Sequence, residues 1–177
     1  MKLNVLIACE ESQTECVEFR NLGHNAFSCD IQPSSGGHQE WHINQDCRPL
    51  LNGNCRFKTE DGKKHYIQGE WDLIIAHPPC TFLTKCGAVR LFSHKYGINE
   101  ERLNKGKMAK EFFMMFFNAR CKHIAIENPV PLKIFNLPKP TTYVEPFQFG
   151  EPFTKKTLLW LINLPPLFPT NYVHPVE

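Results

Sequence analysis

Short, uninterrupted apolar runs constrain the fold of this chain more than any other feature of its sequence. The clearest lies at residues 72–76, where "DLIIA" carries no polar residue after its aspartate. Strands buried on both faces of a parallel sheet have this composition, whereas a strand with one exposed face alternates apolar and polar residues. The predicted strands are residues 3–9, 24–30, 72–76 and 123–128, and the predicted helices are residues 12–23 and 99–121.

The alternation of strands and helices predicts an α/β fold, a Rossmann-like doubly wound sheet with right-handed crossovers. The chain has 177 residues, the length of one domain, which we assign to residues 1–177. Ser12 or Thr14 is expected to cap the first helix, and Gly23 is expected to end it.

Two segments interrupt the alternation. Residues 55–69 are predicted to form a β-hairpin insertion, because two short runs flank the turn dipeptide Asp61-Gly62. Residues 141–150 and 155–164 follow a proline-rich stretch and are predicted to form two antiparallel strands. The sheet is therefore expected to be mostly parallel, with an antiparallel C-terminal edge.

The charge balance is close to neutral, with 20 Lys and Arg against 18 Asp and Glu. The overall charge therefore does not by itself indicate binding to nucleic acid, although local basic patches remain compatible with it. No apolar run approaches about 18 residues, and the N-terminal apolar stretch is too short for a signal peptide. We expect a cytoplasmic protein with no membrane partner, whose eight cysteines are mostly reduced thiols.

Candidate functional residues follow the predicted strands, at the ends where open parallel sheets bind ligands. Asp30, after the second strand, is suited to accept hydrogen bonds from the vicinal ribose hydroxyls of a nucleoside cofactor. The loop after the first strand, "CEESQT", has two carboxylates and no glycine, so it would repel a dinucleotide pyrophosphate. These acids, including Glu10, favour a cationic cofactor with an amino group, such as S-adenosylmethionine.

Cys80 follows two prolines that fix consecutive φ angles, so its thiol is predicted to be held in position rather than packed. Glu127 ends the next strand of the parallel sheet and is expected to lie beside the Cys80 loop. A carboxylic acid at that place could protonate a ring nitrogen while the thiolate attacks the ring. The pair predicts nucleophilic catalysis on a heterocycle.

These motifs resemble the C5-cytosine DNA methyltransferases, in which Pro-Pro-Cys follows one strand and Glu-Asn ends the next. The corresponding residues here are Pro78-Pro79-Cys80 and Glu127-Asn128. The other motifs of the family also have counterparts in the same order, over most of the chain. The chain resembles in particular the compact phage and prophage proteins of the cytosine methyltransferase-like type. The resemblance implies the fold of S-adenosylmethionine-dependent methyltransferases and a phage or prophage origin in a bacterial host.

The resemblance also implies an activity, transfer of a methyl group from S-adenosylmethionine to C5 of cytosine in DNA. Cys80 would add to C6 and Glu127 would protonate N3, after the base has been flipped out of a duplex. The cofactor-binding residues that it implies are Cys9, Glu10, Glu11, Asp30, Ile31, Asp46 and Pro78, with Asp46 on the adenine amino group. The substrate-binding residues that it implies are His77, Pro79, Asn128, Lys155 and Lys156.

Few residues follow Trp160, so the chain has no recognisable target-recognition domain, and a separate protein could supply that function. Two other classes of function remain open. A catalytically inactive protein of the same fold could bind cofactor or nucleic acid, for example in phage counter-defence. Alternatively, a zinc-containing interaction module could use Cys29, His38, His42 and Cys47, although their spacing matches no common finger and our main expectation includes no metal.

An adenine amino-methyltransferase is a weaker alternative. That family holds the exocyclic amine with an acid or amide before Pro-Pro and an aromatic residue after it. His77 and Cys80 occupy these positions here, and neither side chain is a good substitute.

Overall fold

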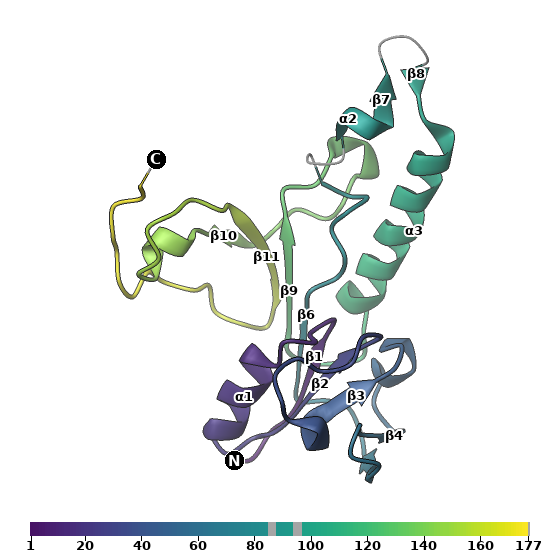
Figure 1. Cartoon of the computed structure of the whole chain (residues 1–177), viewed down its shortest axis with the longest axis vertical. Coiled ribbons are helices and arrows are strands. Elements are labelled where there is room, and N and C mark those ends of the chain that lie inside the picture. Colours follow the sequence, from purple (N-terminus) through teal and green to yellow (C-terminus); the bar gives the residue numbers. More distant parts are fainter. Residues whose placement is uncertain (85–87, 94–96, 177) are drawn as a thin grey trace. The chain divides into compact units, whose positions relative to one another are not determined.

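The computed structural model describes residues 1–84, 88–93 and 97–176 (Figure 1). The fold is α/β, as the alternating pattern predicts. The elements in chain order are β1 (Asn4–Ala8), α1 (Thr14–Asn21), β2 (Asn25–Asp30), β3 (His42–Asn44), β4 (Cys55–Lys58), β5 (Lys64–Ile67), β6 (Leu73–Ala76), α2 (Ala88–Leu91), β7 (Phe92–Ser93), β8 (Gly97–Ile98), α3 (Glu100–Phe117), β9 (Ile124–Pro129), β10 (Thr142–Val144) and β11 (Thr157–Ile162).

The main sheet has seven strands in the order β10-β11-β9-β6-β1-β2-β3. β1 pairs in parallel with β2 and β6, β2 with β3, and β6 with β9. β10 and β11 are antiparallel and lie at one edge. The prediction of a mostly parallel sheet with an antiparallel C-terminal edge is confirmed at this level.

The chain divides into two compact units. Unit 1 comprises Met1–His77 and Met115–Ile126, and unit 2 comprises Pro78–Met114 and Glu127–Glu177. The candidate cofactor residues that precede Pro78 belong to unit 1, whereas Cys80 and Glu127 both belong to unit 2.

The core of unit 1 forms on both faces of its strands, because successive residues of a strand point to opposite sides. Val5, Ile7 and Ala26 pack with Cys16 of α1 on one face. Phe27 follows Ala26 and therefore points to the other face.

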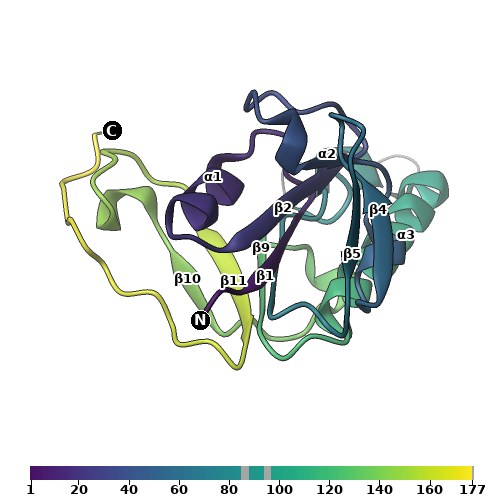
Figure 2. The same ribbon diagram turned by 90° about the horizontal axis from the view of Figure 1, so that it is seen from below.

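The predicted hairpin insertion covers that second face. It is confirmed as the antiparallel pair β4 and β5, drawn side by side in Figure 2. The ring of Phe27 lies 5.0 Å from that of Phe57 in β4 and 6.5 Å from that of Trp71. The hairpin thus takes the place that a helix would occupy in a regular doubly wound domain.

The ends of α1 differ in part from the sequence prediction. Gly23, at φ 87°, ends the helix region as predicted, and its N–H donates to the Arg20 carbonyl at 2.9 Å. The N-cap is Gln13 and makes no side-chain capping bond, so the prediction of a Ser12 or Thr14 cap is wrong. A residue outside the helix, Glu10, supplies the acceptor for the first turn instead, through the Glu15 N–H at 2.6 Å.

Packing in unit 2 is set by aromatic contacts around α3. The rings of Phe113 in α3 and Trp160 in β11 meet edge to face at 4.9 Å. Gly106 lies so close to the Phe135 ring that a Cβ atom would stand 2.1 Å from Cζ. Only glycine fits at this position of α3, because the segment that contains Phe135 packs directly against the helix there.

No helix in the described part of the chain is long and apolar enough to cross a membrane.

Candidate active site

The Pro-Pro-Cys turn begins where β6 ends. The last pair of the β6–β9 ladder is Ala76↔Ile126, so His77 and Glu127 are the next residues on the two strands. Pro78 is buried and Pro79 exposed, and Cys80 and Glu127 are each partly buried. Cys80 is thus neither fully buried nor fully exposed.

The backbone after Cys80 closes into a turn. The Cys80 carbonyl accepts hydrogen bonds from the N–H groups of Leu83, at 3.0 Å, and Thr84, at 3.1 Å. Leu83 and Thr84 are buried, which anchors the far side of the turn. The turn holds Cys80 between a buried proline and a buried leucine.

Three contacts join this turn to the segment that follows Glu127, all within unit 2. Asn128 Nδ2 donates to the Pro78 carbonyl at 2.8 Å. Farther along, the Leu132 N–H donates to the Leu83 carbonyl at 2.7 Å, and Thr84 forms an isolated antiparallel bridge with Pro131. The structure therefore brings the Cys80 turn and the Glu-Asn-Pro segment together as one hydrogen-bonded assembly.

Asn128→Asp is expected to lower the free energy of unfolding by at least about 2 kcal/mol near neutral pH. Asn128 is only 1% exposed, and aspartate would replace its donor with an oxygen facing the Pro78 carbonyl. Denaturant unfolding measures the change, and Asn104→Asp on the exposed side of α3 is the matched control. Equal midpoints for the two variants would show that the amide does not hold the turn.

The loop after β1 has two non-glycine residues in the left-handed region. Cys9 and Gln13 both have φ of 61°. The N–H groups of Cys9 and Glu10 donate to the same acceptor, the Cys29 carbonyl, at 2.8 and 3.3 Å. The loop thus makes a tight turn of the kind that glycine usually allows, and each such residue costs on the order of 1–3 kcal/mol of strain.

Glu10 is a buried carboxylate with one unused oxygen. It is 6% exposed, its Oε1 accepts from the Glu15 N–H, and its Oε2 has no partner among the described residues. Burial raises the pKa of the Glu10 carboxyl to about 7, and the hydrogen bond from Glu15 opposes part of that rise. Oε2 is therefore a buried acceptor whose hydrogen-bonding capacity is not used within the described chain.

The other acids of the predicted cofactor site have partners of their own. Glu11 accepts from the Ser35 hydroxyl, and Asp30 Oδ1 accepts from the Gln32 N–H at 2.8 Å.

Asp46 is also engaged, since Arg48 donates to both of its carboxylate oxygens. This bidentate pair lowers the pKa of Asp46. Ile31 is 78% exposed. Of these residues, Glu11 and Asp30 each keep one carboxylate oxygen with no partner in the described chain.

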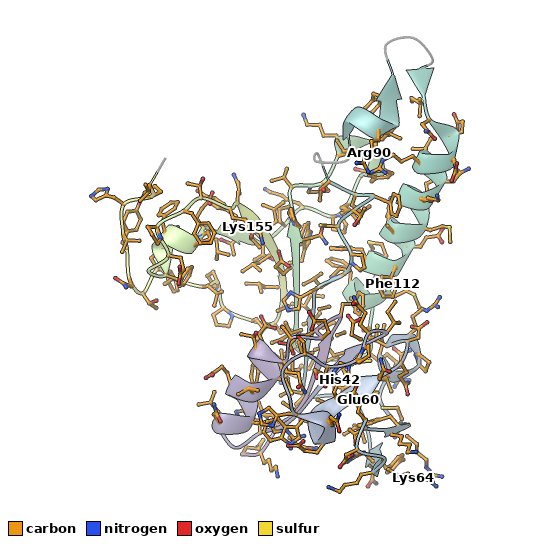
Figure 3. All side chains as sticks on the ribbon, viewed as in Figure 1. His42, Glu60, Lys64, Arg90, Phe112 and Lys155 are labelled. Carbon is orange, nitrogen blue, oxygen red and sulfur yellow. The ribbon has the colours of Figure 1, made fainter. Side chains whose placement is uncertain are left out.

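The predicted substrate residues lie on different segments. His77 Nε2 lies 2.8 Å from Glu15 Oε2, which ties the end of β6 to α1. Lys155 and Lys156 are exposed at the start of β11, where Lys155 is labelled in Figure 3. The Lys156 ammonium stands 4.2 Å from the centre of the Tyr143 ring.

Arg102 of α3 is a neighbour of the Cys80 turn that the sequence analysis does not single out. Its guanidinium donates to the Thr81 carbonyl at 2.9 Å and lies 5.0 Å from the centre of the Phe82 ring. The only sequence signal is a basic residue early in a helix, which is typical of a solvated face. The contact follows from how α3 packs in unit 2.

Three of the four residues of the zinc hypothesis, Cys29, His38 and His42, are used in hydrogen bonds and stacking. His42 is fully buried, with Nδ1 2.8 Å from the Ser28 hydroxyl and Nε2 3.0 Å from the Gln32 carbonyl. The His38 ring stacks on Trp41 at 4.0 Å, and the Cys29 thiol donates to the Gln45 carbonyl. Within residues 1–84, 88–93 and 97–176 no group of three ligand side chains could hold a metal ion.

Cysteines near the first loop are unsuited to nucleophilic chemistry. A hydrogen bond with Cys47 and burial raise the pKa of the Cys9 thiol far above its usual range, and burial does the same for Cys29. Both thiols are therefore neutral at physiological pH, and a neutral thiol is a poor nucleophile.

No model of a known protein family matches the chain, and a comparison with curated proteins gives no match.

Proposed function

We propose that the chain transfers a methyl group from S-adenosylmethionine to C5 of cytosine in DNA, with a fold of the S-adenosylmethionine-dependent methyltransferase type. One observation carries the proposal. The hydrogen bond from Asn128 Nδ2 to the Pro78 carbonyl holds the Pro-Pro-Cys turn against the segment that contains Glu127. A nucleophile and an acid placed on two joined segments suit attack on one ring.

In the proposed reaction the Cys80 thiolate forms a bond to C6, and Glu127 gives its proton to N3. The electron pair of the former C5–C6 double bond then makes C5 a nucleophile. C5 would then take the methyl group that S-adenosylmethionine supplies, and the electron pair of the broken S–CH3 bond would stay on the sulfur of the departing S-adenosylhomocysteine. Loss of the C5 proton to water and expulsion of the Cys80 thiolate then restore the aromatic ring. Glu127 recovers its proton from N3, which returns the enzyme to its starting state.

The residues of unit 1 fit a cationic nucleoside cofactor. The unused Oε2 of Glu10 can accept from an ammonium group, whose charge would offset the cost of ionising a buried carboxylate. The free oxygen of Asp30, together with the one shared with Gln32, can accept from a ribose diol. Asp46 would first have to release Arg48 to reach an adenine amino group.

The test is covalent trapping on a DNA duplex in which 5-fluorocytosine replaces cytosine. Fluorine cannot leave C5 as a cation, so an enzyme of this type remains bonded to C6 after methyl transfer. We expect a complex that survives denaturing electrophoresis and that requires S-adenosylmethionine. Cofactor binding without an adduct would refute the enzymatic proposal and favour the binding protein of the same fold.

A further inference from the structure

The exposed face of the β4–β5 hairpin is basic. Its buried residues, Phe57 among them, alternate with residues that point outward. The outward residues are Arg56, Lys58, Lys64 and Tyr66, and all four are exposed. They form two cross-strand pairs, Arg56 opposite Tyr66 and Lys58 opposite Lys64. We call these four residues the hairpin face.

None of the three cations of the hairpin face is paired with a carboxylate in the described chain. The two acids near the turn are engaged elsewhere. Glu60 accepts from Ser34, and Asp61 pairs with Lys63, which is not part of the hairpin face. Lys64 projects away from the ribbon in Figure 3. The Arg56 guanidinium lies 5.4 Å from the centre of the Tyr66 ring, so the positive charge extends over the whole face.

The pair Lys58 and Lys64 is unfavourable for the hairpin itself. Two like charges placed directly opposite each other on neighbouring strands destabilise the pair. A glutamate at either position would relieve that repulsion. An anionic partner that binds both lysines would relieve the same repulsion.

We propose that the hairpin face binds the phosphate backbone of duplex DNA, outside the candidate active site. The inference rests on the proposed function in taking DNA as the polyanion. Residues two apart on a strand lie about 7 Å apart, so Arg56 and Lys58 span roughly two phosphates of one DNA strand. Such contacts fix position on the duplex without reading its sequence.

The geometry favours a duplex over a single strand. Single-strand sites combine cations with several aromatic rings on which bases stack. The hairpin face has one aromatic ring, Tyr66, and Arg56 lies against it. A rigid two-stranded ribbon with three cations instead matches the regular phosphates of a duplex.

The experiment measures binding of a short, cytosine-free DNA duplex by fluorescence anisotropy between about 50 and 200 mM salt. The variant carries Lys58→Gln and Lys64→Gln. We expect the slope of log affinity against log salt to fall by about 2 and the affinity to fall roughly tenfold per lost contact at about 0.1 M salt. The matched control carries Lys2→Gln and Lys139→Gln, which remove two exposed lysines elsewhere and leave the slope unchanged.

A second variant separates binding from folding. Lys64→Glu changes the charge of the hairpin face by the same two units as the double variant and should also weaken DNA binding. Its unfolding midpoint should equal or exceed that of the wild type, because it replaces a repulsive pair with an attractive one. Unchanged affinity and slope in the double variant, or equal losses in the control, would overturn the proposal. Adduct formation at saturating fluorinated duplex tests Cys80 separately, so either idea can fail while the other stands.

Discussion

Replacing Cys80 by alanine is expected to abolish the covalent adduct with 5-fluorocytosine DNA and to lower methyl transfer by at least about 10³-fold. The thiol forms the bond to C6 in the proposed reaction, and no other group in the described Cys80 turn is a comparable nucleophile. Cys80 is only partly buried, so the variant should unfold at nearly the wild-type denaturant concentration. Denaturing electrophoresis and transfer of a labelled methyl group measure the two losses.

Cys121→Ala is the matched control for this experiment. Cys121 is also partly buried, but its thiol donates to the carbonyls of Trp71 and His123, and burial raises its pKa. It should therefore form no adduct with the pyrimidine, and the control should trap DNA as the wild type does. A Cys80→Ala protein that still forms the adduct would assign the nucleophile to another residue and end the proposed mechanism.

Replacing Glu10 by glutamine is expected to raise the free energy of unfolding by roughly 1–2 kcal/mol at about pH 8 and to change it little at about pH 5. Burial raises the pKa of the folded carboxyl from 4.5 to about 7. Between these values the folded chain binds more protons than the unfolded chain, so the free energy of unfolding falls as pH rises through that window. Above that pH window the ionised carboxylate lowers the free energy of unfolding by about 3 kcal/mol. Glutamine removes this cost, but its unpaired buried amide group is itself unfavourable, so the net increase is smaller.

Denaturant unfolding across this pH range measures the effect, with Glu18→Gln on the exposed side of α1 as the control for the change in charge. If Glu10 binds the ammonium group of the cofactor, the same variant should lose at least about tenfold in affinity for S-adenosylmethionine, measured by calorimetry. A variant that keeps the wild-type pH dependence would show that Glu10 is not the buried acid responsible. A variant that binds the cofactor normally would remove Glu10 from the proposed site.

Most strands of the main sheet were predictable because their signals are local. Each apolar run is complete within a few residues, and the Asp61-Gly62 dipeptide specifies the hairpin without reference to the rest of the chain. β3 was not predicted, since it has only three residues and follows a loop rich in serine and glycine. Its place depends on pairing with β2, which no local pattern reports.

Hydrogen bonding in the first loop depends on distant residues and could not be predicted. The Gln13 amide donates to the Ser28 hydroxyl at 3.2 Å, and that hydroxyl is hydrogen-bonded to His42 Nδ1. Side chains from three segments thus satisfy one another's hydrogen-bonding groups in the core. A lone histidine in a sequence gives no sign of such a partner. For the same reason His42 resembled a metal ligand when only its spacing was known.

The sequence by itself determined which segments form most strands of the main sheet, because burial imposes a pattern that repeats within a few positions. Cys80 follows one of these strands, β6, and Glu127 lies near the end of another, β9. Only the tertiary structure decided that Asn128 holds the Pro78 carbonyl across a separation of 50 residues. It also decided that Asp46 is engaged by Arg48 while Glu10 keeps an unused oxygen. The physical reason is that a hydrogen bond needs two atoms within about 3 Å, and strand register and packing set such distances between remote residues.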